Sequence, residues 1–189
     1  MFPALRHKRG WTGCGLSYKF ILKKAQEQGL DGILVCEDDV LLLDNFDYRW
    51  RQCEKYLNDR EDWDLFQGMM TDIDDVSVSA VHKEFGQTFV HMNHMISTVF
   101  NYYRNGIFDR VIAWDERNED VITNTVDRAL QSQELRVVCT NPFLVGHKEE
   151  LDSDIWDAKN SHYIPQIENS KKKLDELVKR FESEDENEK

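Results

Sequence analysis

Three consecutive carboxylates, Glu37, Asp38 and Asp39, form the stretch of this sequence whose residue types point most clearly to chemistry. Adjacent carboxylates repel one another, so a cluster without positive partners has raised pKa values. A divalent cation relieves this repulsion, and oxygen ligands suit Mg²⁺ or Mn²⁺. The stretch therefore predicts a metal site, and a solvated acidic turn after a strand is the alternative interpretation.

The residues just before the carboxylates predict the element that positions them. Gly32 is followed by Ile33–Cys36, a short apolar run that contains β-branched side chains. A run of this kind is typical of a buried central strand. Because open α/β sheets bind ligands beyond the carboxyl ends of their strands, we expect the acidic cluster to lie at the site.

Upstream of this strand, Trp11–Gly15 predicts a glycine-rich loop whose backbone can approach a ligand closely. Ser17 is the expected N-cap of a helix that ends at Gly29. An amphipathic helix is expected over residues 171–181, and it either packs on the domain or contacts a partner. The other predicted elements are helices over 46–57, 97–104 and 121–130 and strands over 64–68, 77–81, 88–92 and 135–139.

Two further acids, Glu119 and Asp120, come just before the apolar positions of the predicted helix over residues 121–130. Acidic side chains at a helix start interact favourably with the helix dipole, which is a purely structural explanation. A carboxylate held there beside a groove can instead act as a general base. The residues by themselves do not decide between these two roles.

Other residues have metal-binding chemistry without a decisive pattern. The Asp-x-Asp spacing at residues 72–75 suits a metal, but no apolar strand leads into it, so a solvated loop is favoured. His91 and His94 need not converge if they lie on a strand, so structural or acceptor-side roles are favoured. His147 lies at the end of an apolar run, before a polar loop, and this position makes it a candidate for a functional role. The aromatic residues expected to cover the site are Trp156 and Tyr163.

Composition predicts one folded domain in a reducing compartment. With 189 residues, 40% of them hydrophobic, the chain suits a domain at 1–165 followed by an amphipathic helix and acidic tail at 166–189. The net charge of −12 disfavours binding to nucleic acid or to anionic membranes. No apolar run is long enough to span a bilayer, no signal peptide opens the chain, and no CxxC pair occurs. We therefore expect a cytoplasmic protein.

Residues 10–45 resemble the family-25 glycosyltransferases, which include bacterial lipooligosaccharide and procollagen galactosyltransferases. Gly13-Cys14-Gly15-Leu16-Ser17, a helix and a strand ending in Glu37-Asp38-Asp39 are similar to their Gly-Cys-x-x-Ser-His and Glu-Asp-Asp patterns. Weaker similarity occurs at residues 63–68 and 141–155. Tyr18 stands where the family has His, and no first strand with an Asn-Leu-x-x-Arg-x-x-Arg-like segment precedes Trp11.

The resemblance implies a GT-A fold, a Rossmann-like α/β sandwich with a mixed central sheet, here lacking its usual first strand and extended by the C-terminal helix. It also implies a UDP-sugar donor and a Mn(II) or Mg(II) ion. Asp39 then contacts the metal, Glu37 the ribose or a metal-bound water, and His147 takes the place of a further metal ligand. The residues implied to bind the nucleotide-sugar are Gly13, Cys14, Ser17, Glu37 and Asp38.

The implied activity is metal-dependent transfer of a hexose, galactose or glucose, from the UDP-sugar to a saccharide or other hydroxyl acceptor, with inversion. Asn118-Glu119-Asp120 is similar to the x-Glu-Asp motif of inverting GT-A enzymes, in which Asp is the base and Glu holds the acceptor. Trp114 and Asp115 are the expected acceptor contacts. Two other interpretations stay open: a non-catalytic remnant of the fold that binds a protein partner through its C-terminal helix, and a metal-dependent phosphohydrolase.

Overall fold

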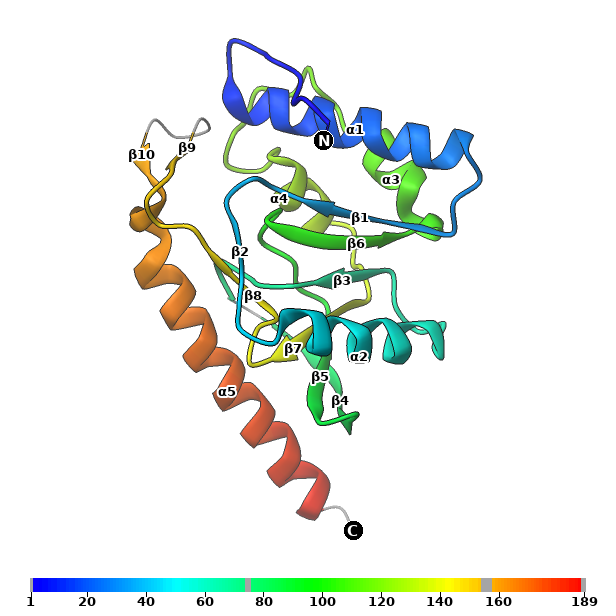
Figure 1. Ribbon diagram of the computed structural model, residues 1–189, viewed down its shortest axis with the longest axis vertical. Coiled ribbons are helices and arrows are strands. Elements are labelled where there is room, and N and C mark those ends of the chain that lie inside the picture. Colours follow the sequence, from blue (N-terminus) through cyan, green and yellow to red (C-terminus); the bar gives the residue numbers. More distant parts are fainter. Residues whose placement is uncertain (1, 74–75, 154–157, 188–189) are drawn as a thin grey trace.

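A mixed β-sheet organises the computed structural model, which describes residues 2–73, 76–153 and 158–187 (Figure 1). Six strands lie in the order β1-β6-β3-β7-β5-β4. β3 and β7 pair in parallel, and the other neighbours pair antiparallel. This arrangement confirms the predicted α/β class with a mixed central sheet. The strands are β1 Gly32–Cys36, β3 Leu65–Gln67, β4 Val78–Glu84, β5 Gln87–Met92, β6 Phe100–Arg104 and β7 Val137–Asn141.

β1 leads into the carboxylates but lies at the edge of the sheet, so the prediction of a buried central strand is wrong. Its sheet neighbour within the described chain is β6, and the side chains of Leu34 and Cys36 are exposed. A short apolar run does not distinguish an edge strand from a central one, because the number of neighbours depends on distant segments. The carboxylates still follow the carboxyl end of the strand, as expected.

The glycines upstream of β1 lie inside a helix and not in a loop. α1 spans Gly10–Glu27, so Ser17 is an interior residue and the predictions of a loop over Trp11–Gly15 and of an N-cap at Ser17 are wrong. The Ser17 hydroxyl instead donates to the carbonyl of Gly13, at 2.8 Å. The predicted end of the helix is confirmed, because α1 stops just before Gly29, whose φ of +65° is a conformation that glycine adopts readily.

Close packing explains why glycines occur in this helix. A Cβ atom on Gly13 would lie 2.5 Å from the backbone oxygen of Leu5, and one on Gly15 would lie 2.5 Å from the ring of Trp114. Any larger residue at these two positions would push the neighbouring segments away. The glycines therefore allow the N-terminal segment and the Trp114 ring to contact α1 directly.

α1 and α2, which spans Phe46–Asn58, cover opposite faces of the sheet. The ring of Tyr18 on α1 lies 6.0 Å from that of Tyr103, whereas the ring of Trp50 on α2 lies 6.1 Å from that of Tyr102. Successive residues of a strand point to opposite faces, so these contacts assign one helix to each face. The sheet therefore lies between the two helices. The carboxyl end of β1, where the three carboxylates follow, borders the pocket described below.

Two predicted helices differ from the structure. Residues 97–104 were expected to be helical, but this prediction is wrong, because Phe100–Arg104 forms β6 between β1 and β3. The pairing of its backbone with two strands outweighs a helix-like spacing of aromatic residues. The helix expected over 121–130 is shorter: α4 spans Val126–Gln131.

A second, smaller pair of strands joins the acidic segment to the C-terminal part of the chain. β2, Val40–Leu42, pairs antiparallel with β8, Val145–His147, so that Val40 lies opposite His147. This pairing brings the residues on either side of it together, including Asp39 and Lys148. The remaining short elements are η1 Asn105–Ile107, α3 Phe108–Ile112, β9 Asp152–Ser153, β10 Ala158–Lys159 and η2 Asn160–Tyr163.

The predicted C-terminal helix is present and longer than expected, because α5 spans Ile164–Asn187. It contacts β4 and β7 and runs along the molecule beside the sheet (Figure 1). Leu174 and Val178 are buried against the core, and Asn141 donates a hydrogen bond to Asp175 at 2.9 Å. Of the two predicted roles, packing on the domain is therefore confirmed. None of the described helices is long and apolar enough to cross a membrane.

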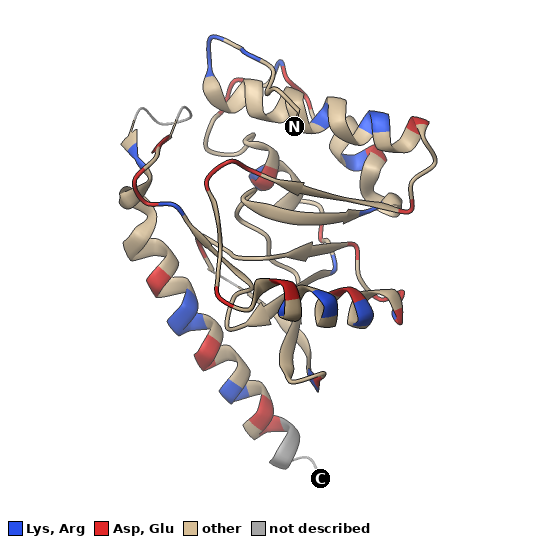
Figure 2. Cartoon of the chain, viewed as in Figure 1, with Lys and Arg blue, Asp and Glu red and all other residues tan. Residues whose placement is uncertain are grey.

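Acidic and basic residues alternate along α5, whereas acidic residues gather at the loop that follows β1 (Figure 2). The alternation is typical of a solvated helix face, in which opposite charges lie within reach of one another. Lys171 and Glu168, for example, are 2.7 Å apart. The acidic loop after β1 differs because its charges are not balanced in this way, and it borders a pocket.

Candidate active site

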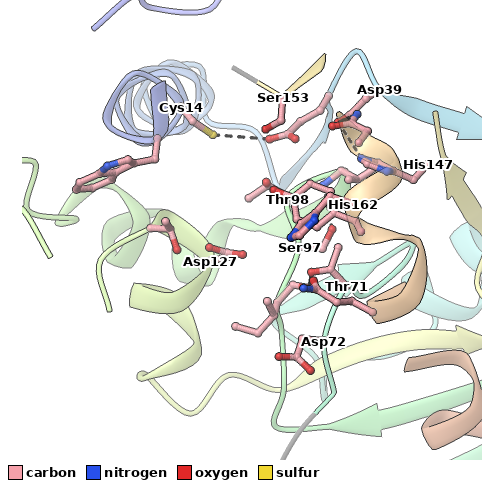
Figure 3. A pocket seen from close by; sticks show the side chains of 18 of the residues that line it. Cys14, Asp39, Thr71, Asp72, Ser97, Thr98, Asp127, His147, Ser153 and His162 are labelled. Carbon is pink, nitrogen blue, oxygen red and sulfur yellow. Dashed lines mark hydrogen bonds and ion pairs between the residues drawn. The ribbon is translucent and has the colours of Figure 1, made fainter. Parts of the chain in front are cut away.

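A pocket of about 410 Å³ opens at the carboxyl end of β1 (Figure 3). Its walls come from α1, the loop after β1, the segments that follow β3 and precede β6, α4, β8 and the segment that leads into α5. These parts are far apart in the chain, so the pocket exists only in the folded protein. The charged and histidine residues that line it are Glu37, Asp39, Asp72, Asp127, Arg128, His147 and His162.

Asp39 is held at the edge of the pocket by two side chains from the C-terminal part. Its Oδ2 lies 3.0 Å from Nε2 of His147 and accepts a hydrogen bond from Nδ2 of Asn160, also at 3.0 Å. His147 and Asn160 are both buried, at 8% and 1% exposure. The backbone amide of Lys148 donates to the backbone oxygen of Asp39 at 2.8 Å, which extends the pairing of β2 with β8 by one residue.

Two buried atoms of this cluster have no hydrogen-bond partner within the described chain: Oδ1 of Asp39 and Nδ1 of His147. A buried carboxylate oxygen without a partner is costly, and a cation is one way to satisfy it. Carboxylate oxygen and imidazole nitrogen are also donors that Mn²⁺ accepts. Asp39 and His147 therefore fit a divalent cation, although the described residues contain no group of three or more His, Cys, Asp or Glu arranged to hold a metal.

Glu37 lines the same pocket but makes different contacts. Its Oε1 accepts from the thiol of Cys14 at 3.7 Å and from the hydroxyl of Tyr18 at 3.5 Å. Burial, and secondly the charge of Asp39, raises the pKa of the Glu37 carboxyl to about 7. Burial and the charge of Glu37 also raise the pKa of the Cys14 thiol, so this thiol is protonated at neutral pH. Glu37 and Cys14 are thus two half-buried, protonatable groups in the lining of the pocket.

Comparison with known protein families identifies the family of the chain. The family model described as glycosyltransferase family 25 (LPS biosynthesis protein) matches residues 8–114, which is more than half of the chain. The chain belongs to glycosyltransferase family 25. No curated protein matches this chain significantly. The fold is accordingly that of a GT-A-like glycosyltransferase, and the activity is glycosyl transfer.

The family-25 match includes Glu37 and Asp39 but not the residues that hold Asp39 in place. His147 and Asn160 lie beyond residue 114, as do the α4 residues of the pocket. The predicted metal residues are brought together in part: Asp39 and His147 are in contact, and Glu37 lines the same pocket. Cys14, predicted at the nucleotide-sugar, also lines it.

Three of the other residues implied to bind the nucleotide-sugar do not line the described pocket. Gly13 and Ser17 face the N-terminal segment, where the Ser17 hydroxyl accepts from the backbone amide of Leu5 at 2.8 Å. The side chain of Asp38 is exposed, and its backbone oxygen accepts from Nζ of Lys148 at 2.8 Å. These contacts give all three residues a part in positioning their neighbours.

The predicted catalytic acids lie outside the described pocket lining, on an exposed loop before α4. Oδ1 of Asp120 accepts from the amide of Ile122 at 2.9 Å, and Oδ2 accepts from the hydroxyl of Thr123 at 2.8 Å. Glu119 forms an ion pair with Arg9. Because α4 begins at Val126, these acids do not occupy its first turn, so the predicted N-terminal charge capping does not occur either.

The predicted acceptor contacts also lie elsewhere. The ring of Trp114 is 4% exposed, packs edge-on against Trp11 at 6.4 Å, and donates from Nε1 to the backbone oxygen of Asn124 at 3.0 Å. This ring is part of the core between α1 and α4, with no open face for a sugar. Asp115 is exposed and pairs with Arg117 at 3.1 Å.

The two histidines that invited a metal interpretation are structural. Nε2 of His91 lies 2.6 Å from the hydroxyl of Tyr56, and burial lowers the pKa of His91 to about 4. Nε2 of His94 lies 2.6 Å from the backbone oxygen of Asp72. Of the second acidic loop, Asp72 lines the pocket, and Asp74 and Asp75 lie outside the described residues, as does Trp156.

Sequence reasoning missed Asn160 and Asp127, which the fold brings into the pocket. An isolated Asn outside any recognisable motif carries no distinctive signal, so the sequence did not single out Asn160. Asp127 lies within the predicted helix over 121–130, where an acidic residue is usually interpreted as part of the solvent-exposed face. Tyr163 was expected at the site and does line it, with its ring 5.7 Å from that of His147.

Proposed function

We propose that this domain transfers a hexose from a UDP-sugar to a hydroxyl acceptor with inversion, and that the transfer requires Mn²⁺ or Mg²⁺. One observation carries the proposal. Oδ2 of Asp39 is fixed by His147 and Asn160, while Oδ1 is buried and has no partner among the described residues. A fixed carboxylate with one free oxygen, at the end of a strand and beside an imidazole, is suited to binding a cation.

The charge of the pocket also supports a metal-dependent reaction. Four carboxylates line it, those of Glu37, Asp39, Asp72 and Asp127, whereas Arg128 is the one Lys or Arg among the described lining residues. A nucleoside diphosphate is itself an anion, so these carboxylates would repel it in the absence of a bound cation. The pocket is therefore expected to bind UDP and the metal together, and to bind UDP alone poorly.

Within this reaction, Asp39 and His147 would hold the cation, and Asn160 would keep the Asp39 carboxylate in its orientation. A cation there offsets the negative charge that develops on the departing diphosphate. Glu37, in the pocket lining, presents a carboxyl that can hydrogen-bond a sugar hydroxyl. The volume of about 410 Å³ lies within the range of pockets that enclose small ligands.

The test is UDP release from a panel of UDP-hexoses, including UDP-galactose and UDP-glucose, with and without Mn(II). Water can replace the acceptor, so no acceptor need be known. We expect Mn(II)-dependent release of UDP from one donor, and a rise in the melting temperature when UDP and Mn(II) are added together. Both effects should be lost in Asp39→Asn.

Asp44→Asn is the matched control, because Asp44 is exposed, close in sequence to Asp39, and outside the pocket lining. Its activity and its response to UDP and Mn(II) should equal those of the wild type. If no donor releases UDP and UDP does not bind, the proposal is refuted and a non-catalytic domain is favoured. Turnover that is independent of metal would refute the metal requirement alone.

A further inference from the structure

Asp127 is the second residue of α4 and lies on the side of the pocket away from Asp39 and His147 (Figure 3). The buried residues Val126 and Leu130 anchor this short helix in the core. The side chain of Asp127 is half-buried, so it is held by a fixed backbone yet remains accessible from the pocket. The cavity thus has Asp39 and His147 on one side and the carboxylate of Asp127 on the other (Figure 3).

One of the two carboxylate oxygens of Asp127 is engaged in a hydrogen bond within the described chain, and the other is not. Its Oδ1 accepts a hydrogen bond from the backbone amide of Arg128 at 2.9 Å, and its Oδ2 has no hydrogen-bond partner in the described parts of the chain. No ion pair neutralises it there. A carboxylate that is held at one oxygen and free at the other can accept a proton from a bound hydroxyl.

Asp72 is the other pocket carboxylate that contacts neither Cys14 nor His147. It lies between β3 and β4, outside any helix or strand, whereas Asp127 belongs to α4, which two buried residues hold against the core. A general base must be held within reach of the proton that it removes, so the backbone favours Asp127 over Asp72.

We propose that Asp127 is the general base of the transfer, the role that sequence similarity suggested for Asp120. This inference rests on the proposed function. The acceptor oxygen forms a bond to the anomeric carbon of the hexose as the bond from that carbon to the diphosphate breaks, and the electron pair of the broken bond leaves with UDP. The acceptor proton passes to Oδ2 of Asp127. Inversion requires the acceptor to attack from the side of the sugar opposite to the departing diphosphate. Asp127 lies across the pocket from Asp39 and His147, which would hold the cation that offsets the charge of the diphosphate (Figure 3).

Asp120 is unsuited to this role because both of its oxygens already accept local hydrogen bonds and its side chain is exposed outside the pocket lining. Glu119, its neighbour, pairs with Arg9. A base must reach the proton that it removes, and reach is decided by the fold before any question of proton affinity arises.

The experiment compares Asp127→Asn with Asp120→Asn and Asp72→Asn, using hydrolysis of the UDP-hexose that the wild type turns over in Mn(II). We expect Asp127→Asn to lower kcat by about 10²–10⁴-fold, because an amide cannot accept the proton. KM and the thermal shift with UDP and Mn(II) should stay within about twofold of the wild type, since donor and metal are held elsewhere. Asp47→Asn is the matched control, because Asp47 is likewise the second residue of a helix, α2, and is exposed.

Azide separates a missing base from a damaged fold. Azide attacks the anomeric carbon without a proton to lose, so it should restore UDP release to Asp127→Asn and not to Asp39→Asn. Full activity of Asp127→Asn, or loss of UDP binding in it, would overturn the assignment while leaving the transferase intact. Loss of kcat with azide rescue in Asp120→Asn or Asp72→Asn would overturn it in favour of that residue. A wild type that releases UDP from no donor would overturn the proposed function, and this inference with it.

Discussion

The loop at residues 37–39 and the loop at 119–120 both carry adjacent acids, but Asp39 and Asp120 obtain their hydrogen-bond partners from different parts of the chain. Asp39 is held by His147 and Asn160, which lie 108 and 121 residues away in the sequence. Asp120 accepts hydrogen bonds from residues two and three positions away. An acid satisfied by its own turn is stable and solvated, whereas an acid held by distant residues keeps an unsatisfied oxygen inside a pocket. A distant partner alone does not mark a site, because Glu119 in the exposed loop pairs with Arg9, 110 residues away. The buried oxygen of Asp39 that lacks a partner within the described chain marks the candidate active site.

The largest expected contrast between the two loops comes from removing one partner of each. His147→Ala should lower Mn(II)-dependent UDP release by at least about 100-fold, because Asp39 then loses its imidazole neighbour at the cation site. Arg9→Gln, which removes the ion-pair partner of Glu119, should change the rate by less than about twofold, since surface ion pairs contribute little. Steady-state rates at saturating Mn(II) measure both, and equal losses in the two variants would erase the contrast.

A smaller contrast concerns the hydrogen bond that orients each acid. Asn160→Ala should raise the Mn(II) concentration needed for half-maximal activity by about 10–100-fold, because Asp39 loses one of the two donors that orient it. Thr123→Ala, which removes the corresponding donor to Asp120, should leave that concentration unchanged. Titration of activity with Mn(II) is the measurement. An Asn160→Ala protein with wild-type metal dependence would show that His147 alone is sufficient.

The two loops should also differ in how pH affects stability without metal. Burial raises the pKa of Glu37 to about 7, so the folded state binds the proton more tightly than the unfolded state. The stabilisation from Glu37 is therefore complete below about pH 4.5 and is lost as the pH rises through 7. Hydrogen bonds to Thr123 and Ile122 lower the pKa of Asp120, so its contribution is present above its usual pKa and is lost only in acid.

Urea unfolding at pH 5 and pH 8, after removal of metal, tests this difference. Glu37→Gln should reduce the loss of stability between the two pH values by about 1–3 kcal/mol relative to the wild type. Asp120→Asn should leave that difference as it is, because Asp120 is ionised in both states throughout this interval. A Glu37→Gln protein with the wild-type pH dependence would contradict the burial of the Glu37 charge.

The smallest effect is expected for the ion pair of the exposed loop. Arg9 and Glu119 are 28% and 68% exposed at their side chains, so solvent screens their attraction. Glu119→Gln should shift the melting temperature by at most about 2 °C and should leave UDP release unchanged. A large loss of activity in this variant, with the fold intact, would return the exposed loop to consideration as part of the site.

Much of the fold could be predicted because its signals are local. The hairpin of β4 and β5, the strands β3 and β7, α2 and the C-terminal helix follow from periodicity and turn residues over a few positions. β6 could not, because its aromatic residues satisfy a helical spacing and become a strand only between β1 and β3. The glycines of α1 led to a wrong prediction of a loop for a related reason. They lie in a helix, where their lack of a side chain lets Leu5 and Trp114 pack closely against it.

The sequence by itself determined the fold class, the family and the acidic end of β1, since an apolar run followed by three carboxylates within the family-25 match is a local pattern. Tertiary structure alone decided that β1 is an edge strand, that Asp39 meets His147 and Asn160, and that Asp127 faces the pocket while Asp120 does not. The physical reason is the separation along the sequence between the residues that interact. Helix and strand periodicity act over a few residues, whereas the burial and pairing of a charge depend on segments more than a hundred residues away.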